Sequence, residues 1–226
     1  MKYLFQKFKK KPAISFAEVA VVGFLLVAIV CMFLGKVFDI SQESDVIYKW
    51  KKVLASAQYS YDVLLLTKKN DLEQSLKLSQ PQRDGAILEL FKTTLNLDTV
   101  NDKLPEKSLK SYKYRFLNGL SVSSDTKYYV QKMGYSPDKR VLVGINWFND
   151  KCLKGQDLCG IIVFDLNGTK MPNRFGLDVF GVNIYGDRLE PFGTGLSYQD
   201  NEKNCRRLET GVTCSKFYLM GGQFFK

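Results

Sequence analysis

A long apolar stretch near the amino terminus constrains this chain most. Residues 14–35 read ISFAEVAVVGFLLVAIVCMFLG, about 22 residues against the ~20 that a helix needs to cross a bilayer. Five lysines precede this stretch and supply half of the formal net charge of +10: Lys2, Lys7, Lys9, Lys10 and Lys11. The excess of positive charge on this side predicts a single-pass membrane helix with residues 1–13 in the cytoplasm and the rest outside.

One charged residue interrupts the apolar pattern. Glu18 lies four residues after Ile14, and an ionised carboxylate facing lipid costs on the order of 3 kcal/mol. One interpretation places Glu18 at the headgroup level, with the helix effectively beginning after it. The other interpretation, which we favour, gives the carboxylate a positive partner in an assembled state.

The segment KKKPAISFAEVAVVGFLLVAIV resembles the amino-terminal signal of type IV pilins and type II secretion pseudopilins. The shared features are a basic leader, a small residue before the cleavage site (Ala13), an apolar first mature residue (Ile14), Phe16 at the third mature position and glutamate at the fifth (Glu18). Most members of the family have glycine where this chain has Ala13.

The resemblance implies how the chain is processed and assembled. A prepilin peptidase removes residues 1–13, the new amino group of Ile14 is methylated, and Glu18 of an incoming subunit neutralises the amino terminus of its neighbour. Opposite charges attract strongly in a medium of low dielectric constant, so this pair can set the register of assembly. The implied locations are the bacterial inner membrane before cleavage and an extracytoplasmic filament of pilin or pseudopilin subunits afterwards.

The rest of the chain predicts an α+β fold. Apolar residues recur at helical spacing over residues 36–66, which predicts an amphipathic continuation of the first helix: Val46, Trp50, Val53, Leu54, Ala57, Tyr61, Leu64 and Leu65. Residues 67–226 predict a globular extracytoplasmic domain, with a connection over 67–83 and a shorter helix over 87–95. From Tyr112 onward, alternating patterns predict the strands of an antiparallel sheet: the segments 112–116, 127–133, 140–148, 159–165 and 179–185. The resemblance implies that the long helix packs on this sheet.

Four of the five cysteines lie beyond the apolar stretch, and an even number there indicates disulfides in an oxidising compartment. Three connectivities are open. We favour Cys152 with Cys159 and Cys205 with Cys214, because each pair closes a short polar loop. The alternative is four reduced thiols.

The segment 160–193 resembles, more loosely, the carboxy-terminal region of many prepilin-like proteins, some of which bind calcium there. Asp165, Asn167 and Asp178 supply oxygen ligands of the kind that calcium takes. The interpretation that we favour is an Asn-Gly turn whose side chains bond the local backbone. Calcium is the only cofactor that the sequence suggests.

The chain contains no histidine, which excludes histidine-based hydrolase triads and histidine zinc sites. No catalytic motif stands out, so we predict a structural protein and not an enzyme. Two other functions stay open. One is a plain anchored domain. The other is a domain that binds nucleic acid or a surface ligand, which we do not favour, through exposed basic residues: Lys139, Arg140, Lys203, Arg206 and Arg207.

Overall fold

The computed structural model describes residues 16–95, 97, 112–130, 132–136, 141–154 and 157–224, except for the side chains of 16–20, 31–42 and 81. The chain divides into two units, the first ending at Gln42 and the second running from Glu43 to Lys226. We describe each unit by itself and call the second the ectodomain.

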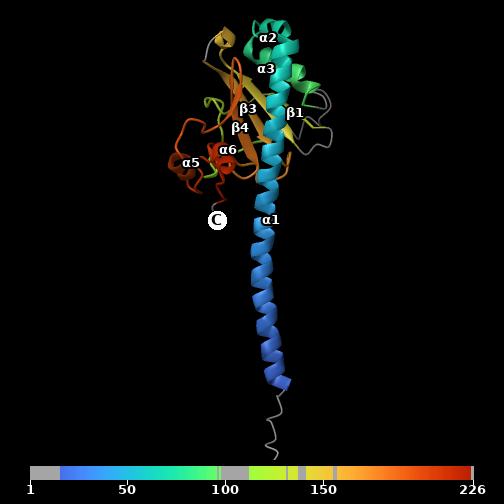
Figure 1. Cartoon of the computed structure of the whole chain (residues 1–226), viewed down its shortest axis with the longest axis vertical. Helices are drawn as coiled ribbons and strands as arrows, with labels where there is room; N and C mark the ends of the chain where they lie inside the picture. Colours follow the sequence, from blue (N-terminus) through green and yellow to red (C-terminus); the bar gives the residue numbers. More distant parts are fainter. Residues whose placement is uncertain are drawn as a thin grey trace, which may run out of the picture. The chain divides into compact units, whose positions relative to one another are not determined.

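The first element is the helix α1, Phe16–Thr67, which enters both units (Figure 1). It ends one residue beyond the predicted end at residue 66. Among the residues that the structure describes, no helix has the length and apolar composition needed to span a membrane. The membrane helix predicted over 14–35 includes residues outside the described ones, and it stays a prediction.

Two shorter helices follow α1: α2, Lys69–Ser75, and α3, Gln80–Lys92. The prediction of a connection over 67–83 was therefore wrong. Leu72 and Leu76 are buried in the core. This segment is polar in overall composition, but one face of it is apolar and packs on the core. The predicted second helix is present as α3, although it begins earlier than residue 87.

Five antiparallel strands form one sheet in sequential order. They are β1 (Lys132–Tyr135), β2 (Leu142–Trp147), β3 (Leu158–Asp165), β4 (Val179–Tyr185) and β5 (Leu189–Pro191). The α+β class is confirmed. The segment 112–116 was wrongly predicted as a strand, because Arg115 makes only isolated bridges, to Ser121 and Arg174.

Alternation along the central strands divides the core into two layers. On β3, Ile162 and Phe164 belong to the layer that includes α1. Ile161 and Val163 belong to the second layer, which is covered by the chain around Tyr114. The sheet is thus apolar on both faces.

The ectodomain portion of α1 supplies the first layer with a narrow row of buried side chains: Trp50, Leu54, Ala57, Tyr61 and Leu64. The ring of Trp50 stacks on that of Phe180 at 5.1 Å between centroids. The hydroxyl of Tyr61 donates a 2.6 Å hydrogen bond to the backbone oxygen of Tyr185 at the end of β4. These contacts fix α1 against the sheet within the ectodomain.

Short helices complete the ectodomain after β5: α5 (Tyr198–Asn204), α6 (Cys214–Phe217) and the 3₁₀ turn η2 (Tyr218–Met220), while the 3₁₀ turn η1 (Cys152–Lys154) follows β2. The backbone N–H of Phe224 donates a 2.6 Å hydrogen bond to the Glu43 carboxylate on α1. The carboxy-terminal part of the chain therefore lies beside the first residues of the ectodomain (Figure 1).

Candidate functional site

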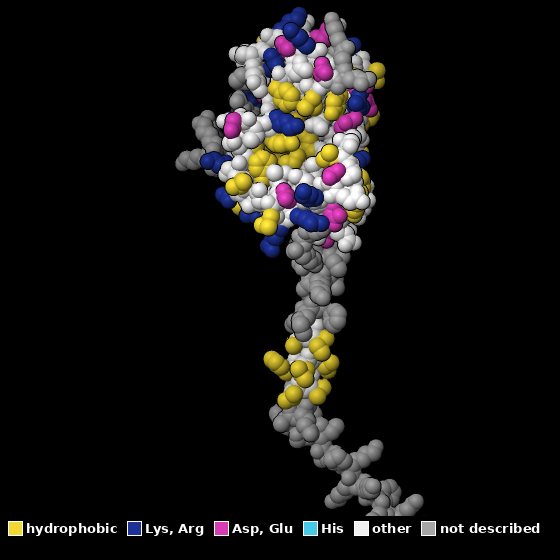
Figure 2. Space-filling model, turned by 90° about the vertical axis from the view of Figure 1, so that its left-hand side faces the viewer, with side chains coloured by type: hydrophobic (Ala, Val, Ile, Leu, Met, Phe, Trp, Pro, Cys, Tyr) yellow, Lys and Arg dark blue, Asp and Glu magenta, His cyan; other side chains and the backbone are white. Residues whose placement is uncertain are grey.

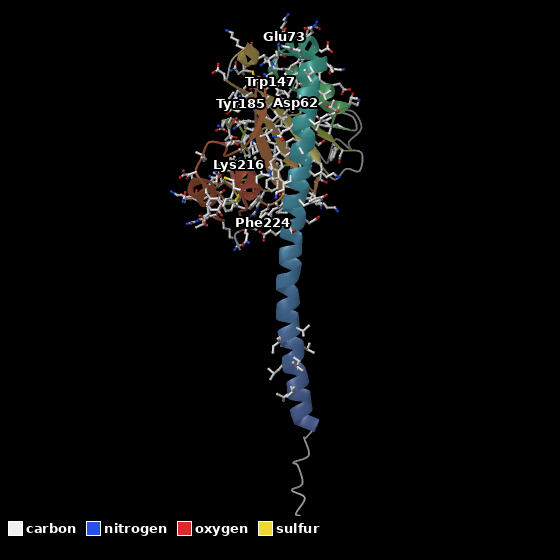
Figure 3. The ribbon with its side chains drawn as sticks, viewed as in Figure 1. Asp62, Glu73, Trp147, Tyr185, Lys216 and Phe224 are labelled. Carbon is white, nitrogen blue, oxygen red and sulfur yellow. A yellow bond between two sulfur atoms is a disulfide. The ribbon has the colours of Figure 1, made fainter. Side chains whose placement is uncertain are left out.

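The described side chains of α1 in the first unit form an exposed apolar surface. Between residues 21 and 30 the exposed fractions include 60% for Val21, 75% for Phe24 and 61% for Val27. Because successive residues are ~100° apart around a helix, these side chains point to several sides of it, as Figures 2 and 3 show. A helix that is apolar all round is normally buried, in a protein core or in a membrane.

The predicted processing signal extends beyond the part of the chain that the structure describes. Ala13 and Ile14 lie outside the described residues, and Glu18 belongs to α1 but its side chain lies outside them too. Cleavage before Ile14, methylation of Ile14 and the assembly role of Glu18 stay predictions.

Both predicted disulfides are present. Cys152 is joined to Cys159 and Cys205 to Cys214, with 5.1 Å between the Cα atoms in each pair. All four cysteines are buried. The first bond closes the loop between β2 and β3, and the second ties the end of α5 to the start of α6.

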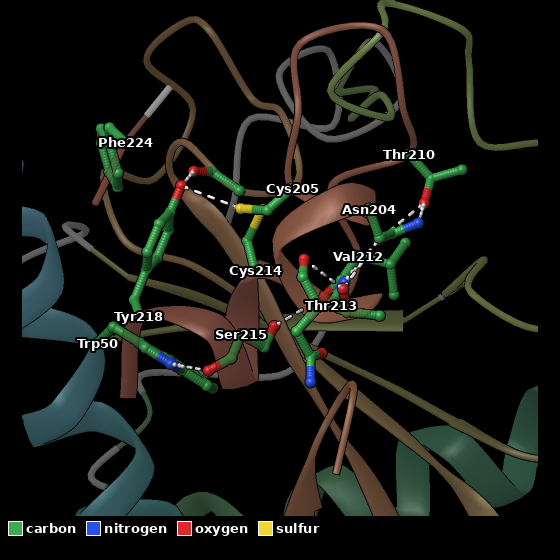
Figure 4. Close-up of a disulfide and its surroundings, with 12 residues drawn as sticks. Trp50, Asn204, Cys205, Thr210, Val212, Thr213, Cys214, Ser215, Tyr218 and Phe224 are labelled. Carbon is green, nitrogen blue, oxygen red and sulfur yellow. Dashed lines mark hydrogen bonds between the residues drawn. A yellow bond between two sulfur atoms is a disulfide. The ribbon is translucent and has the colours of Figure 1, made fainter. Parts of the chain in front are cut away.

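The Cys205–Cys214 bond lies in a network of hydrogen bonds (Figure 4). The hydroxyl of Tyr218 donates to the backbone oxygen of Gly176 at 2.8 Å. Nearby, the Asn204 amide oxygen accepts from the backbone N–H of Thr213 at 3.0 Å. The disulfide thus ties α5 to α6, and Ser215 in α6 is hydrogen-bonded to Trp50 of α1 and to Gly181 of β4.

The three predicted calcium ligands lie together at the turn between β3 and β4. The Asn167 amide donates to the Asp178 carboxylate at 2.9 Å, and the Asn167 backbone N–H donates to Asp165 at 3.1 Å. Gly168 has a φ of 72°, a left-handed conformation that suits glycine. The hydrogen-bonded Asn-Gly turn is thus present.

Other parts of the chain also bond these two carboxylates. The hydroxyl of Tyr112 donates to Asp165 at 2.5 Å, and the backbone N–H groups of Asn173 and Arg174 donate to Asp178 at 2.8 and 2.6 Å. Sequence reasoning missed Tyr112 and Asn173. No sequence signal pairs Tyr112 with a residue 53 positions away.

Burial makes this turn electrostatically costly. Both carboxylates are almost fully buried. Burial, followed by repulsion from Asp178, raises the pKa of Asp165 to about 8. Burial also raises the pKa of Asp178, although hydrogen bonds from four N–H donors oppose the shift.

The oxygen atoms at this turn are of the kind that bind a hard cation. The amide oxygens of Asn167 and Asn173 are buried and accept no hydrogen bond from a described residue, and calcium takes carboxylate and amide oxygens. Among the described residues, however, no three His, Cys, Asp or Glu side chains come together as a metal-binding group. If calcium binds here, Asp165, Asp178, Asn167 and Asn173 would hold it; calcium binding stays a prediction.

The basic residues considered for nucleic-acid binding are partly placed. Lys203, Arg206 and Arg207 are exposed in α5 and the loop after it, whereas Lys139 and Arg140 lie outside the described residues. Acidic residues share this segment, namely Asp200, Glu202 and Glu209, and they offset its positive charge. Nothing in this arrangement favours nucleic acid over a solvated surface.

Comparisons of the chain with protein-family models, with curated proteins and with solved structures found no match.

Proposed function

We propose that this chain is a prepilin-like structural subunit that is stored in the bacterial inner membrane, cleaved before Ile14 and polymerised through its amino-terminal helix. The filament is of the type IV pilus or type II secretion class. The ectodomain forms the outer part of each subunit.

The observation that carries this proposal is the change of environment along α1. From Trp50 to Leu64 one face of the helix is buried against the sheet. Between residues 21 and 30 the same helix exposes apolar side chains on several sides. An exposed apolar helix attached to a folded domain suits a protein whose helix is stored in lipid and later packs among other helices.

The sequence around the start of α1 supports the same function. Ala13 and Ile14 form a cleavage site after a basic leader, and Glu18 places one carboxylate in an apolar segment. In a filament core an unpaired carboxylate is costly, whereas the amino group of Ile14 from a neighbouring subunit neutralises it. The pair therefore favours one axial position of each new subunit.

A pair of substitutions at Glu18 tests the proposal. Glu18→Ala and Glu18→Gln both remove the charge, and Glu18→Gln keeps the size of the side chain. We expect both variants to insert into the membrane and to lose assembly, measured as protein in the sheared filament fraction. Assembly of both variants at the wild-type level would contradict the assembly role of Glu18, whereas absence of the wild-type chain from the filament fraction would leave a plain membrane-anchored domain.

A further inference from the structure

Two arginines lie next to each other in the ectodomain, where two extended segments run side by side. The backbone N–H of Arg115 donates to the oxygen of Asn173 at 2.9 Å, and the backbone N–H of Phe175 donates to the oxygen of Arg115 at 2.9 Å. These bonds make Arg115 and Arg174 a parallel bridge. Because side chains alternate along extended backbone and bridged residues share a face, both guanidinium groups leave the backbone on the same side.

Aromatic packing on the opposite side holds this pair of segments in place. Tyr114 and Phe116 flank Arg115, and their rings lie 5.7 and 5.9 Å from that of Phe175 between centroids. The hydroxyl of Tyr114 also donates a 2.6 Å hydrogen bond to the backbone oxygen of Tyr128. The backbone beneath the two arginines thus belongs to the second core layer, so a ligand does not have to order it on binding.

The side of the backbone that carries the arginines carries other hydrogen-bond donors too. Ser121 forms an antiparallel bridge with Arg115, which places the exposed hydroxyl of Ser121 on the same side. Lys113 lies two residues before Arg115 and is exposed, and alternation places it on that side as well. Three cations and one hydroxyl therefore come from adjacent positions of one small surface.

The positive charges of this surface lack a counter-charge within the described part of the chain. Lys113, Arg115 and Arg174 form no ion pair with a described residue. The Asp178 carboxylate accepts from the backbone N–H of Arg174 and not from its guanidinium. The Nε atom of Arg174 is buried without an acceptor among the described residues, and its Nη2 lies 3.9 Å from the position that a Cβ atom on Gly119 would take. Neighbouring like charges repel and a buried donor without an acceptor is costly, so an anion bound here would be stabilised.

We propose that Arg115 and Arg174 form a binding site for a phosphate monoester, with Ser121 and Lys113 as further donors. The planar guanidinium group matches phosphate oxygens through two parallel hydrogen bonds. A phosphate monoester carries a charge of about −1.5 to −2 at neutral pH, which neutralises both arginines. A phosphate diester carries a single charge and leaves one arginine uncompensated. The site lies in the ectodomain and does not depend on the proposed function.

Isothermal titration calorimetry of the full chain in detergent, at constant ionic strength, tests the site. The probe is methyl phosphate at a pH of about 8, where a monoester has lost its second proton. Dimethyl phosphate is the matched ligand, because it has the same tetrahedral centre and one negative charge fewer. We expect methyl phosphate to bind at least ~10-fold more tightly. Equal affinities, or no binding of methyl phosphate at millimolar concentrations, would overturn the proposal.

Substitutions show whether the two arginines hold the ligand. Arg115→Gln and Arg174→Gln should each weaken the binding of methyl phosphate at least ~10-fold, whereas Arg115→Lys keeps the charge but loses the paired donors and should have a smaller effect. Arg188→Gln is the matched control, because it removes the same charge from a guanidinium that Asp187 and Glu190 already pair. Near-ultraviolet circular dichroism shows that each variant folds. Equal weakening in Arg188→Gln would mean general attraction to a basic protein and would overturn the proposal.

Two kinds of molecule carry a phosphate monoester, and the same titration separates them. Glucose 1-phosphate represents a soluble ligand, and short-chain phosphatidic acid in the detergent micelles represents a lipid headgroup. The compound that binds more tightly than methyl phosphate identifies the source, provided that Arg115→Gln weakens its binding. Binding of both compounds that Arg115→Gln leaves unchanged would place the ligand elsewhere and contradict the site.

Discussion

The indole N–H of Trp50 donates a 2.8 Å hydrogen bond to the backbone oxygen of Ser215, and this bond joins α1 to α6 across 165 residues of sequence. The hydroxyl of Ser215 in turn accepts from the backbone N–H of Gly181 on β4 at 3.0 Å. Helix, sheet and carboxy-terminal segment thus meet at one buried point.

Trp50→Ala should therefore lower the free energy of unfolding by about 3–5 kcal/mol, through the cavity and the lost hydrogen bond. Trp50→Phe keeps an aromatic ring on Phe180 but leaves the Ser215 oxygen unpaired, so we expect a loss of only about 1–3 kcal/mol. Urea unfolding of the full chain in detergent measures both values. No loss for Trp50→Phe would contradict a separate role for the hydrogen bond, and equal losses for the two variants would contradict one for the aromatic ring.

Removing the Cys205–Cys214 bond by a double serine substitution should cost about 2–4 kcal/mol, because it frees a loop in the unfolded chain. The matched variant lacks the Cys152–Cys159 bond, which closes a loop of similar length. We expect thermal unfolding to show a larger loss without Cys205–Cys214, since that segment also contacts α1 and the sheet. An equal loss would mean that loop entropy alone accounts for both bonds.

Lowering the pH from about 8 should raise the free energy of unfolding of the ectodomain. The pKa of Asp165 is raised from 3.8 to about 8 in the folded chain, so the folded state binds a proton more tightly than the unfolded state. The stabilisation is fully present below the unfolded pKa and is lost as the pH rises through about 8. Asp84 acts in the same direction over a lower range, because burial raises its pKa to about 6.

Asp165→Asn should flatten this pH dependence between about pH 4 and 8. The check is the melting temperature of wild-type and variant chains across that range. A wild-type melting temperature that rises with pH over the whole range would contradict the assignment.

The calcium hypothesis makes a separate prediction at pH 8. A bound cation pairs with both carboxylates, so millimolar calcium should raise the melting temperature, and Asp178→Asn should abolish the increase. Magnesium is the control ion, because it demands a tighter octahedral site. If calcium does not raise the melting temperature, these residues form a hydrogen-bonded turn and not a calcium site.

The sequence predicted the elements that have strong local patterns. The row from Trp50 to Leu64 predicted the buried face of α1, and the alternating segment Val179–Tyr185 matches β4. Both disulfides were predicted because each pair of cysteines closes a short polar loop. In each case the signal lies within a few residues and does not depend on distant partners.

The errors arose where distant partners decide the structure. The alternation of Tyr112, Tyr114 and Phe116 predicted a strand, but the neighbouring Arg115 N–H bonds the Asn173 oxygen. The alternation reflects packing on the second core layer and not a strand ladder. For the same reason, the donation from Tyr112 to Asp165 could not be predicted from the sequence.

The central claim, processing as a prepilin-like subunit, is tested most directly by the intact mass and amino-terminal sequence of the chain recovered from membranes or sheared filaments. The account predicts a chain that begins at methylated Ile14 and lacks residues 1–13. An intact chain beginning at Met1, from cells with an active prepilin peptidase, would contradict it.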